Sequence, residues 1–180
     1  MSPAAAVHRL EALLRARKLD GTLTTALAQR TRRDPSDLIS TGLAQVDSPL
    51  GGGFARGEVS EIVGAETSGR TSLFLRTLAA ATARGELVAV VDALDRLDVS
   101  SAKGAGVDLE RLLWVRGPRA LERSVKAVTL VLQARVCDVV IFDIADAPLS
   151  AMRTLPWTTW MRLHRMIGFA EHRQLVVQAD

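Results

Sequence analysis

The segment from Gly64 to Thr71 constrains the fold of this chain more than any other. It reads Gly-Ala-Glu-Thr-Ser-Gly-Arg-Thr and lies between a short apolar run, residues 59–63, and a stretch of helical periodicity, residues 71–84. A strand, a glycine loop and a helix in this order form a cradle in which backbone N–H groups and a helix N-terminus bind phosphate. The segment therefore predicts an α/β domain with a phosphate-type loop.

Five loop positions are candidate nucleotide-binding residues. Gly64, Ser68 and Gly69 belong to the backbone cradle, and Thr71 is in the place of a hydroxyl that holds magnesium. The position before Thr71 calls for lysine, whose compact ammonium reaches the phosphates, but the residue is Arg70. A planar guanidinium cannot occupy the same slot unchanged. The loop is therefore predicted to be vestigial, and two interpretations stay open: weak binding of ATP with magnesium, or a loop shape kept without a ligand.

Downstream of the loop, short apolar runs alternate with helical stretches. The runs that predict four further strands are residues 87–91, 112–115, 139–142 and 175–177, and helical spacing occurs at 121–132 and 157–169. Continuous apolar runs are typical of strands that are buried on both faces of a parallel sheet. The pattern predicts a mainly parallel five-stranded sheet with helices on both faces.

Asp143 directly follows the apolar run at 139–142. A nucleotide-hydrolysing α/β domain places the acid that orders magnesium at the carboxyl end of such a strand. Taken alone, Asp143 is better interpreted as an ordinary residue that caps a turn. The loop and the acid together are more specific than either one, so Asp143 joins the vestigial nucleotide site.

A helix is predicted over residues 2–18. A serine followed by proline is typical of a helix start, and Val7, Leu10 and Leu14 follow at helical spacing. Their apolar stripe is narrow, and the other faces are basic. Two interpretations fit this pattern: a helix packed on its own core with a solvated basic face, or a helix that docks on a partner.

A polar stretch, residues 31–36, ends in an Asp-Pro turn signal and is predicted to be a linker. We therefore divide the chain into an N-terminal helical docking segment with its linker, residues 1–36, and an α/β core, residues 37–180.

Composition excludes several functional classes. Cys137 is the single cysteine and there are 3 histidines, so an internal disulfide and a metal cluster of ordinary spacing are not expected. The chain has 23 basic and 20 acidic residues, no tyrosine, 4 phenylalanines and 3 tryptophans. This balance disfavours strong intrinsic binding to nucleic acid. Without a long apolar run or a signal-peptide pattern, we expect a cytoplasmic protein that does not enter a membrane.

Four side chains in the second half carry predictions that the structure can check. Trp157 and Trp160 lie three positions apart on a predicted helix, and burial against the sheet is the favoured interpretation over an exposed anchor for a partner. His164 has no nucleophile identifiable beside it and is predicted to be packed or on the surface. Cys137 is predicted to be a small buried apolar filler.

Several short motifs occur in the order found in the RecA superfamily, so residues 39–180 resemble the RecA core. They are Ile39-Ser40-Thr41-Gly42, Asp47, Leu50-Gly51-Gly52-Gly53-Phe54, Gly57-Glu58-Val59, Glu61-Ile62, the loop, Val91-Asp92-Ala93, Gly106-Val107-Asp108 and Leu112-Leu113. Small size, an altered loop and a Trp-rich helix make the chain most similar to the ImuA family, the RecA-like accessory proteins of bacterial mutagenesis cassettes. The resemblance implies a RecA-like P-loop core.

The departures from RecA concern its reaction. In RecA an Asp-Ala-Glu stretch follows the second strand, and its glutamate activates the attacking water; the matching stretch here is Asp92-Ala93-Leu94. Leucine cannot accept a proton, so the general base is absent unless Asp95 replaces it. The segment 144–153, where RecA has its first DNA loop, is short, and the second loop would begin near Asp180. We therefore expect weak or no direct DNA binding.

The resemblance implies a non-catalytic adaptor in DNA-damage-induced translesion synthesis and mutagenesis. Its implied partners are the polymerase-like ImuB of the same cassette and RecA, and self-association is a third prediction, with residues 2–18 as the docking element. Two alternatives stay open. One is a weak ATPase that uses Arg70, Thr71 and Asp143, and the other is a SulA-like cell-division inhibitor on the same fold.

Overall fold

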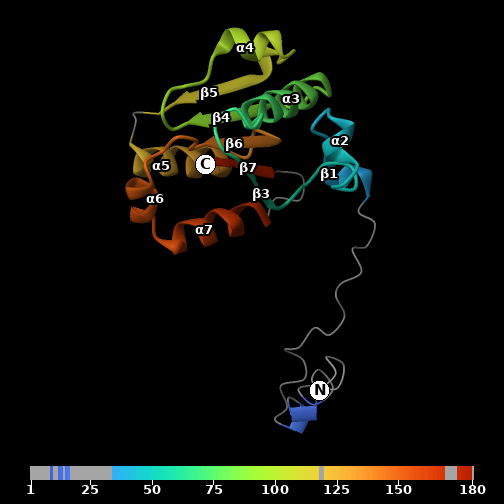
Figure 1. The fold of residues 1–180 in the computed structure, drawn as a ribbon, viewed down its shortest axis with the longest axis vertical. Helices are drawn as coiled ribbons and strands as arrows, with labels where there is room; N and C mark the ends of the chain where they lie inside the picture. Colours follow the sequence, from blue (N-terminus) through green and yellow to red (C-terminus); the bar gives the residue numbers. More distant parts are fainter. Residues whose placement is uncertain are drawn as a thin grey trace. The chain divides into compact units, whose positions relative to one another are not determined.

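The computed structural model describes residues 9, 12, 13, 15, 16, 34–117, 120–168 and 174–179, the last segment in its backbone alone (Figure 1). The chain divides into two compact units, residues 1–33 and 34–180. In the first unit the five described residues are helical. Val7, Leu10 and Leu14, the predicted partner-binding residues, lie outside the described residues.

The second unit alternates strands and helices, and it contains short elements beyond those that the sequence predicts. The helices are η2 (Pro35–Asp37), α2 (Ala44–Asp47), α3 (Arg70–Ala83), α4 (Val99–Gly104), η3 (Leu109–Arg111), α5 (Leu121–Ala134), α6 (Leu149–Thr154) and α7 (Trp157–Gly168). The strands are β1 (Leu38–Ile39), β2 (Phe54–Ala55), β3 (Val59–Val63), β4 (Val88–Asp92), β5 (Leu112–Arg116), β6 (Val139–Asp143) and β7 (Gln174–Ala179).

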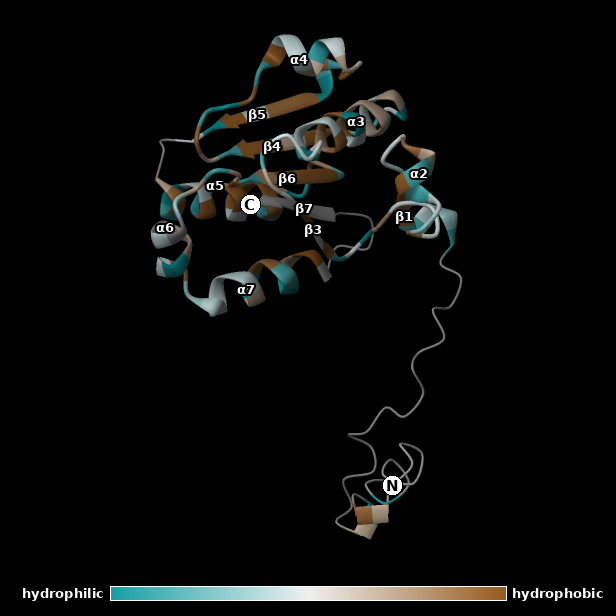
Figure 2. Cartoon of the chain, in the orientation of Figure 1, coloured by the Kyte–Doolittle hydropathy of each residue, from teal (hydrophilic) through white to brown (hydrophobic). Residues whose placement is uncertain are grey.

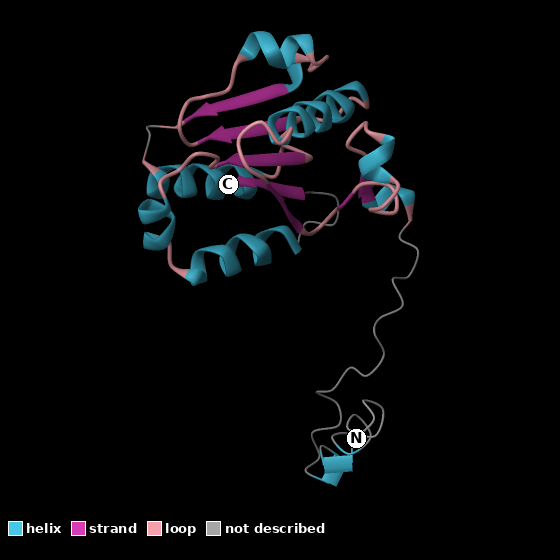
Figure 3. Ribbon diagram, viewed as in Figure 1, coloured by secondary structure: helices cyan, strands magenta, loops and turns pink. Residues whose placement is uncertain are grey.

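The main sheet has the strand order β3-β7-β6-β4-β5, and every neighbouring pair is parallel. Helices lie on both sides of it (Figure 3). The predicted α/β class with a parallel sheet is therefore confirmed. All parallel strands end at the same edge, so Asp92 and Asp143, which are paired in register at the ends of β4 and β6, lie side by side.

Strand β4 is buried on both faces because two hydrophobic clusters divide its side chains. Val88 and Val90 pack in a cluster with side chains of α3 and α4. Ala89 and Val91 pack in a second cluster with side chains of α5 and α7. Figure 2 shows the resulting hydrophobic colour along β4 and β6. The alternation follows from the strand period of two, since successive side chains point to opposite faces.

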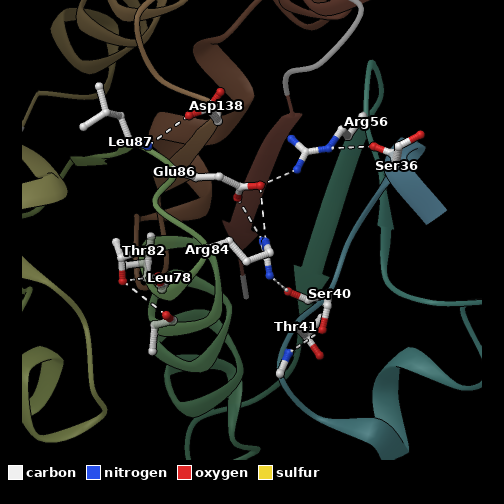
Figure 4. Close-up of polar contacts among 12 residues, drawn as sticks. Ser36, Ser40, Thr41, Arg56, Leu78, Thr82, Arg84, Glu86, Leu87 and Asp138 are labelled. Atoms are coloured by element: carbon white, nitrogen blue, oxygen red, sulfur yellow. Dashed lines mark hydrogen bonds and ion pairs between the residues drawn. The ribbon is translucent and has the colours of Figure 1, made fainter.

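A small two-stranded sheet, in which β1 pairs with β2 antiparallel, is held against the core by charged side chains. Arg56 follows β2 and pairs with Glu86, which also binds Arg84 at 2.9 Å. Arg56 and Arg84 in turn donate to the backbone carbonyls of Ser36 and Ser40 (Figure 4). The Arg56 and Glu86 side chains are 11% and 16% exposed, so this pair is shielded from water.

The structure corrects one side-chain prediction and agrees with others. Trp157 is not buried against the sheet but is 74% exposed. Trp160 is partly buried and packs on Phe142, with ring centroids 6.5 Å apart. Cys137 is buried, as predicted, and His164 is on the surface. None of the described helices is both long and apolar enough to cross a membrane.

Candidate functional site

The predicted loop connects β3 to α3, and glycine suits its conformation at two positions. Gly69 has a φ of 91°, a left-handed conformation that side chains disfavour. A Cβ atom at Gly64 would lie 2.5 Å from the Ser68 Oγ. Strand, loop and helix thus have the arrangement expected of a phosphate-type loop.

The N-terminus of α3 is open to an anion. Its N-cap residue, Gly69, supplies no side-chain hydrogen bond, and the first turn holds no acidic residue. The positive end of the helix dipole favours negative charge at this place.

A cavity of about 240 Å³ opens next to the loop, at the carboxyl ends of β4 and β6. Arg70, Thr71 and Asp143 all line it, so the fold brings together three of the six predicted nucleotide-site residues. The other three, Gly64, Ser68 and Gly69, do not line this cavity and belong to the loop, whose residues are largely exposed.

Arg70 points into the protein. It is 8% exposed, and its Nη2 lies 3.6 Å from Oδ1 of Asp146, a residue of the turn after β6. The other carboxylate oxygen of Asp146 accepts a hydrogen bond of 2.7 Å from Arg96. The Asp146 carboxylate therefore lies between the guanidinium groups of Arg70 and Arg96, as a bound anion would.

Asp143 is a largely buried carboxyl at the end of β6. Burial raises its pKa to about 6, and the negative charges of Asp92 and Asp146 act in the same direction. A hydrogen bond of 3.1 Å from the Ala145 N–H and the charge of Arg70 oppose this rise. Close to neutral pH, a fraction of the Asp143 carboxyl groups is therefore protonated.

The stretch after β4 contains no free acid at the position of the RecA glutamate. Leu94 occupies it and lines the cavity. Asp92 is 1% exposed and accepts hydrogen bonds from the Leu97 N–H at 2.7 Å and the Trp114 indole at 3.3 Å, so it holds the turn in place. The neighbouring candidate, Asp95, forms a two-pronged ion pair with Arg116 and does not line the cavity.

The charge of the cavity is unfavourable for a nucleotide triphosphate. Four aspartates line it (Asp92, Asp98, Asp143 and Asp146) against two arginines (Arg70 and Arg96), which is a net charge of −2 when all six are ionised. In the described ranges, no group of three or more His, Cys, Asp or Glu side chains is arranged to hold a metal ion. An excess of negative charge of this kind repels the phosphates of a nucleotide.

Sequence reasoning missed Asp146, Arg96 and Asp98. Asp146 lies three residues after Asp143 in a turn and has a φ of 61°, and no local pattern marks it as a partner of Arg70. Asp98 caps α4, where hydrogen bonds from Ser101 lower the pKa of its carboxyl. A capping position of this kind could have been found from the sequence.

A second, apolar cavity of about 530 Å³ lies at the amino ends of β4 and β5 beside α5. We call it the β5 groove. Its lining includes Leu113, Leu130 and Val136, which are 51%, 65% and 61% exposed. Since β5 is an edge strand of the sheet, the groove borders a strand edge that has no partner among the described residues.

Comparison with known proteins gives a consistent result. The family model of the RecA N-terminal domain matches residues 12–152, well over half of the chain. The chain is 40% identical over 107 residues to Protein RecA of Synechococcus sp. (strain CC9902), a match that covers 59% of this chain and 28% of that protein. It is 39% identical over 112 residues to Protein RecA of Mycobacterium ulcerans (strain Agy99), covering 62% and 32%.

The chain spans less than a third of the length of these RecA proteins. The match to the family model nevertheless includes the loop and the residues that line the cavity. The chain therefore belongs to the RecA N-terminal domain family.

Proposed function

We propose that this chain is a RecA-like domain that does not turn over ATP and that acts as a non-catalytic adaptor. The observation that carries the proposal is the pairing of Arg70 with Asp146 inside the cavity. A cation that reaches phosphates must be free to turn toward the loop, whereas this guanidinium is buried against a carboxylate of its own chain. Leu94 supports the proposal further, because it leaves the water-activating position without a base.

The resemblance to the ImuA family supports a more specific role. We propose that the adaptor acts in the cytoplasm, in translesion synthesis and mutagenesis after DNA damage, and that it binds a polymerase-like ImuB protein, RecA, or a second copy of itself. Any DNA binding by this chain is weak in this proposal. A SulA-like cell-division inhibitor on the same fold remains an alternative.

The β5 groove supports binding to a RecA-type protomer. It is apolar, borders an edge strand, and has leucines of high exposure at its rim. The occupant we propose is the helix predicted over residues 2–18 of a second protomer, whose stripe of Val7, Leu10 and Leu14 supplies matching apolar side chains. Apolar burial at a strand edge is an ordinary source of affinity between protein chains.

ATP turnover tests the first part of the proposal. We expect hydrolysis at the blank rate with magnesium present, for the wild type and for Thr71→Ala alike. Turnover above the blank that disappears in Thr71→Ala would contradict the proposal. A nucleotide that binds without turnover would raise the melting temperature by mass action, and this measurement separates binding from catalysis.

The docking role is tested with Leu113→Asp combined with Leu130→Asp. Both side chains are more than half exposed, so we expect the melting temperature to stay nearly unchanged while binding to RecA, to ImuB or to a second copy is lost. Leu50→Asp is a matched control, because Leu50 is 42% exposed and lies outside the groove. Equal binding by wild type and double mutant would exclude the groove as the docking site.

The same loss is expected from Leu10→Asp combined with Leu14→Asp on the docking helix. If this pair were buried within its own domain, two unpaired carboxylates would cost several kcal/mol, and the protein would be destabilised outright. Circular dichroism melts and a binding assay on the same variant distinguish the two cases.

A weak ATPase is the second candidate function. The open N-terminus of α3 and the convergence of Thr71 and Asp143 on one cavity favour it. In that case Asp143→Asn and Thr71→Ala would each abolish a measurable magnesium-dependent turnover.

A further inference from the structure

Helix α7 carries two large apolar side chains on its outer face. Trp157 is 74% and Met161 is 41% exposed, while Leu163 and Ile167 on the opposite side are buried. Trp157, Met161 and Arg165 recur every four residues, so they form one line along the helix. A surface helix ordinarily places polar residues on such a line. The packing of the domain therefore does not account for the tryptophan and the methionine.

The same surface is basic. Arg153 on α6 and Arg162, His164 and Arg165 on α7 are exposed. Residues 147–168 contain no Asp or Glu, although the chain as a whole has 20. In the described part of the chain, no carboxylate forms an ion pair with any of these three arginines. Among the described residues, this positive charge is therefore not neutralised by an ion pair.

We propose that this α7 surface, defined by Trp157, Met161, Arg153, Arg162 and Arg165, binds an acidic peptide segment of a partner protein that carries a large apolar side chain. Tryptophan and arginine are the side chains most enriched at the energetic centres of protein interfaces. Trp157 and Met161 supply apolar area, and the surrounding arginines complement carboxylates. The surface shares no residue with the cavity or the β5 groove, so the inference does not rest on the function proposed above.

The side chains favour a peptide over single-stranded nucleic acid. Nucleic-acid strands are bound on several aromatic side chains, each of which stacks on a base. On the outer line of α7 the tryptophan is followed by Met161, a flexible side chain that adapts to irregular apolar groups. One aromatic beside a methionine matches an apolar side chain of a peptide better than a series of bases.

The test is fluorescence anisotropy on the full chain with a panel of fluorescein-labelled amphipathic peptides, with Glu and Asp on one face and Leu and Trp on the other. We expect binding that weakens as NaCl is raised. Trp157→Ala should raise the Kd about tenfold, and Arg162→Glu combined with Arg165→Glu should raise it about tenfold as well. All three residues are exposed, so the melting temperatures should match the wild type.

Arg76→Glu combined with Lys103→Glu is the matched control. These exposed residues lie on α3 and α4, which pack on the other face of the sheet, and the change in net charge is the same. We expect the Kd to stay within about twofold, since distant exposed charges are screened. An equal loss in this control would overturn the proposal in favour of unspecific attraction.

Three further results would overturn the proposal. One is a failure of every acidic peptide to bind, and another is equal binding of the same peptides with lysine in place of Glu and Asp. The third is binding of oligo(dT), but of no peptide, that is lost in Trp157→Ala and in the Arg162 and Arg165 double variant. That last result would make the α7 surface a nucleic-acid site instead.

Discussion

Replacing Asp143 by asparagine tests whether the buried negative charge of Asp143 destabilises the folded protein. Asp143 is largely buried, and its neighbours Asp92 and Asp146 are both acidic, so its negative charge is unfavourable in the folded state. Asparagine has the same size and keeps an oxygen that can accept the hydrogen bond from the Ala145 N–H. The substitution therefore removes the charge and little else.

The size of the effect follows from the pKa. The carboxyl has a usual pKa of 3.8, and the folded protein raises it to about 6. Between these values the folded state binds more protons than the unfolded state, so stability falls as the pH rises. A difference of about two pKa units corresponds to about 3 kcal/mol in the free energy of unfolding. This destabilisation is complete above pH 6 and absent below the usual pKa of the carboxyl.

Urea denaturation of the wild type and Asp143→Asn at a series of pH values measures this effect. We expect the variant to be more stable at pH 8 by up to about 3 kcal/mol, and the difference to shrink toward zero as the pH falls to 4. Added magnesium should not change the difference. A variant that is less stable than the wild type at pH 8, or a wild type that magnesium stabilises, would refute the reasoning and return Asp143 to a metal-binding role.

Asp47 is a control with the opposite sign. Burial alone would raise the pKa of its carboxyl, but hydrogen bonds from Ser40, Thr41 and Gly42 outweigh burial and lower it. A lowered pKa contributes stability above the usual pKa, and that stability is lost as the pH falls through the folded-state value. Asp47→Asn should therefore lower stability at neutral pH, and the difference should disappear in acid.

Three further substitutions test the fold. Leu78→Ala removes a fully buried side chain and should cost about 3 kcal/mol in urea denaturation. Gly53→Ala should lower the free energy of unfolding by at least about 2 kcal/mol, because Gly53 has a φ of 137° and a Cβ atom there would collide with the Ile39 carbonyl. An unchanged melting temperature would contradict this contact. Glu86→Gln removes the charge that binds Arg56 and should lower the free energy of unfolding by about 2 kcal/mol. If this loss becomes smaller at high salt, the pair is not shielded from solvent.

The strands of the main sheet, the helices α3, α5 and α7 and the loop could be predicted because their signals are local, whereas the short elements β1, β2, α2, α4 and α6 were not predicted. The apolar runs of β4 and β6 are long enough to specify strands buried on two faces, and the glycine loop between β3 and α3 specifies a crossover to a parallel strand. Two site properties are also visible in the sequence itself. Arg70 is in the place of lysine and Leu94 in the place of glutamate, and these two replacements are read directly from the sequence.

The tertiary structure alone decided how the site residues are used. Arg70 could have faced the loop, but packing places it beside Asp146, a contact between residues far apart in the chain. The pKa of Asp143 likewise depends on Asp92, which another strand brings alongside it. Helical spacing predicted that Trp157 and Trp160 lie near each other on α7, but the direction in which each one points depends on what the helix packs against. Periodicity is a property of one segment, whereas burial and charge pairing depend on neighbours that the chain brings together only when it folds.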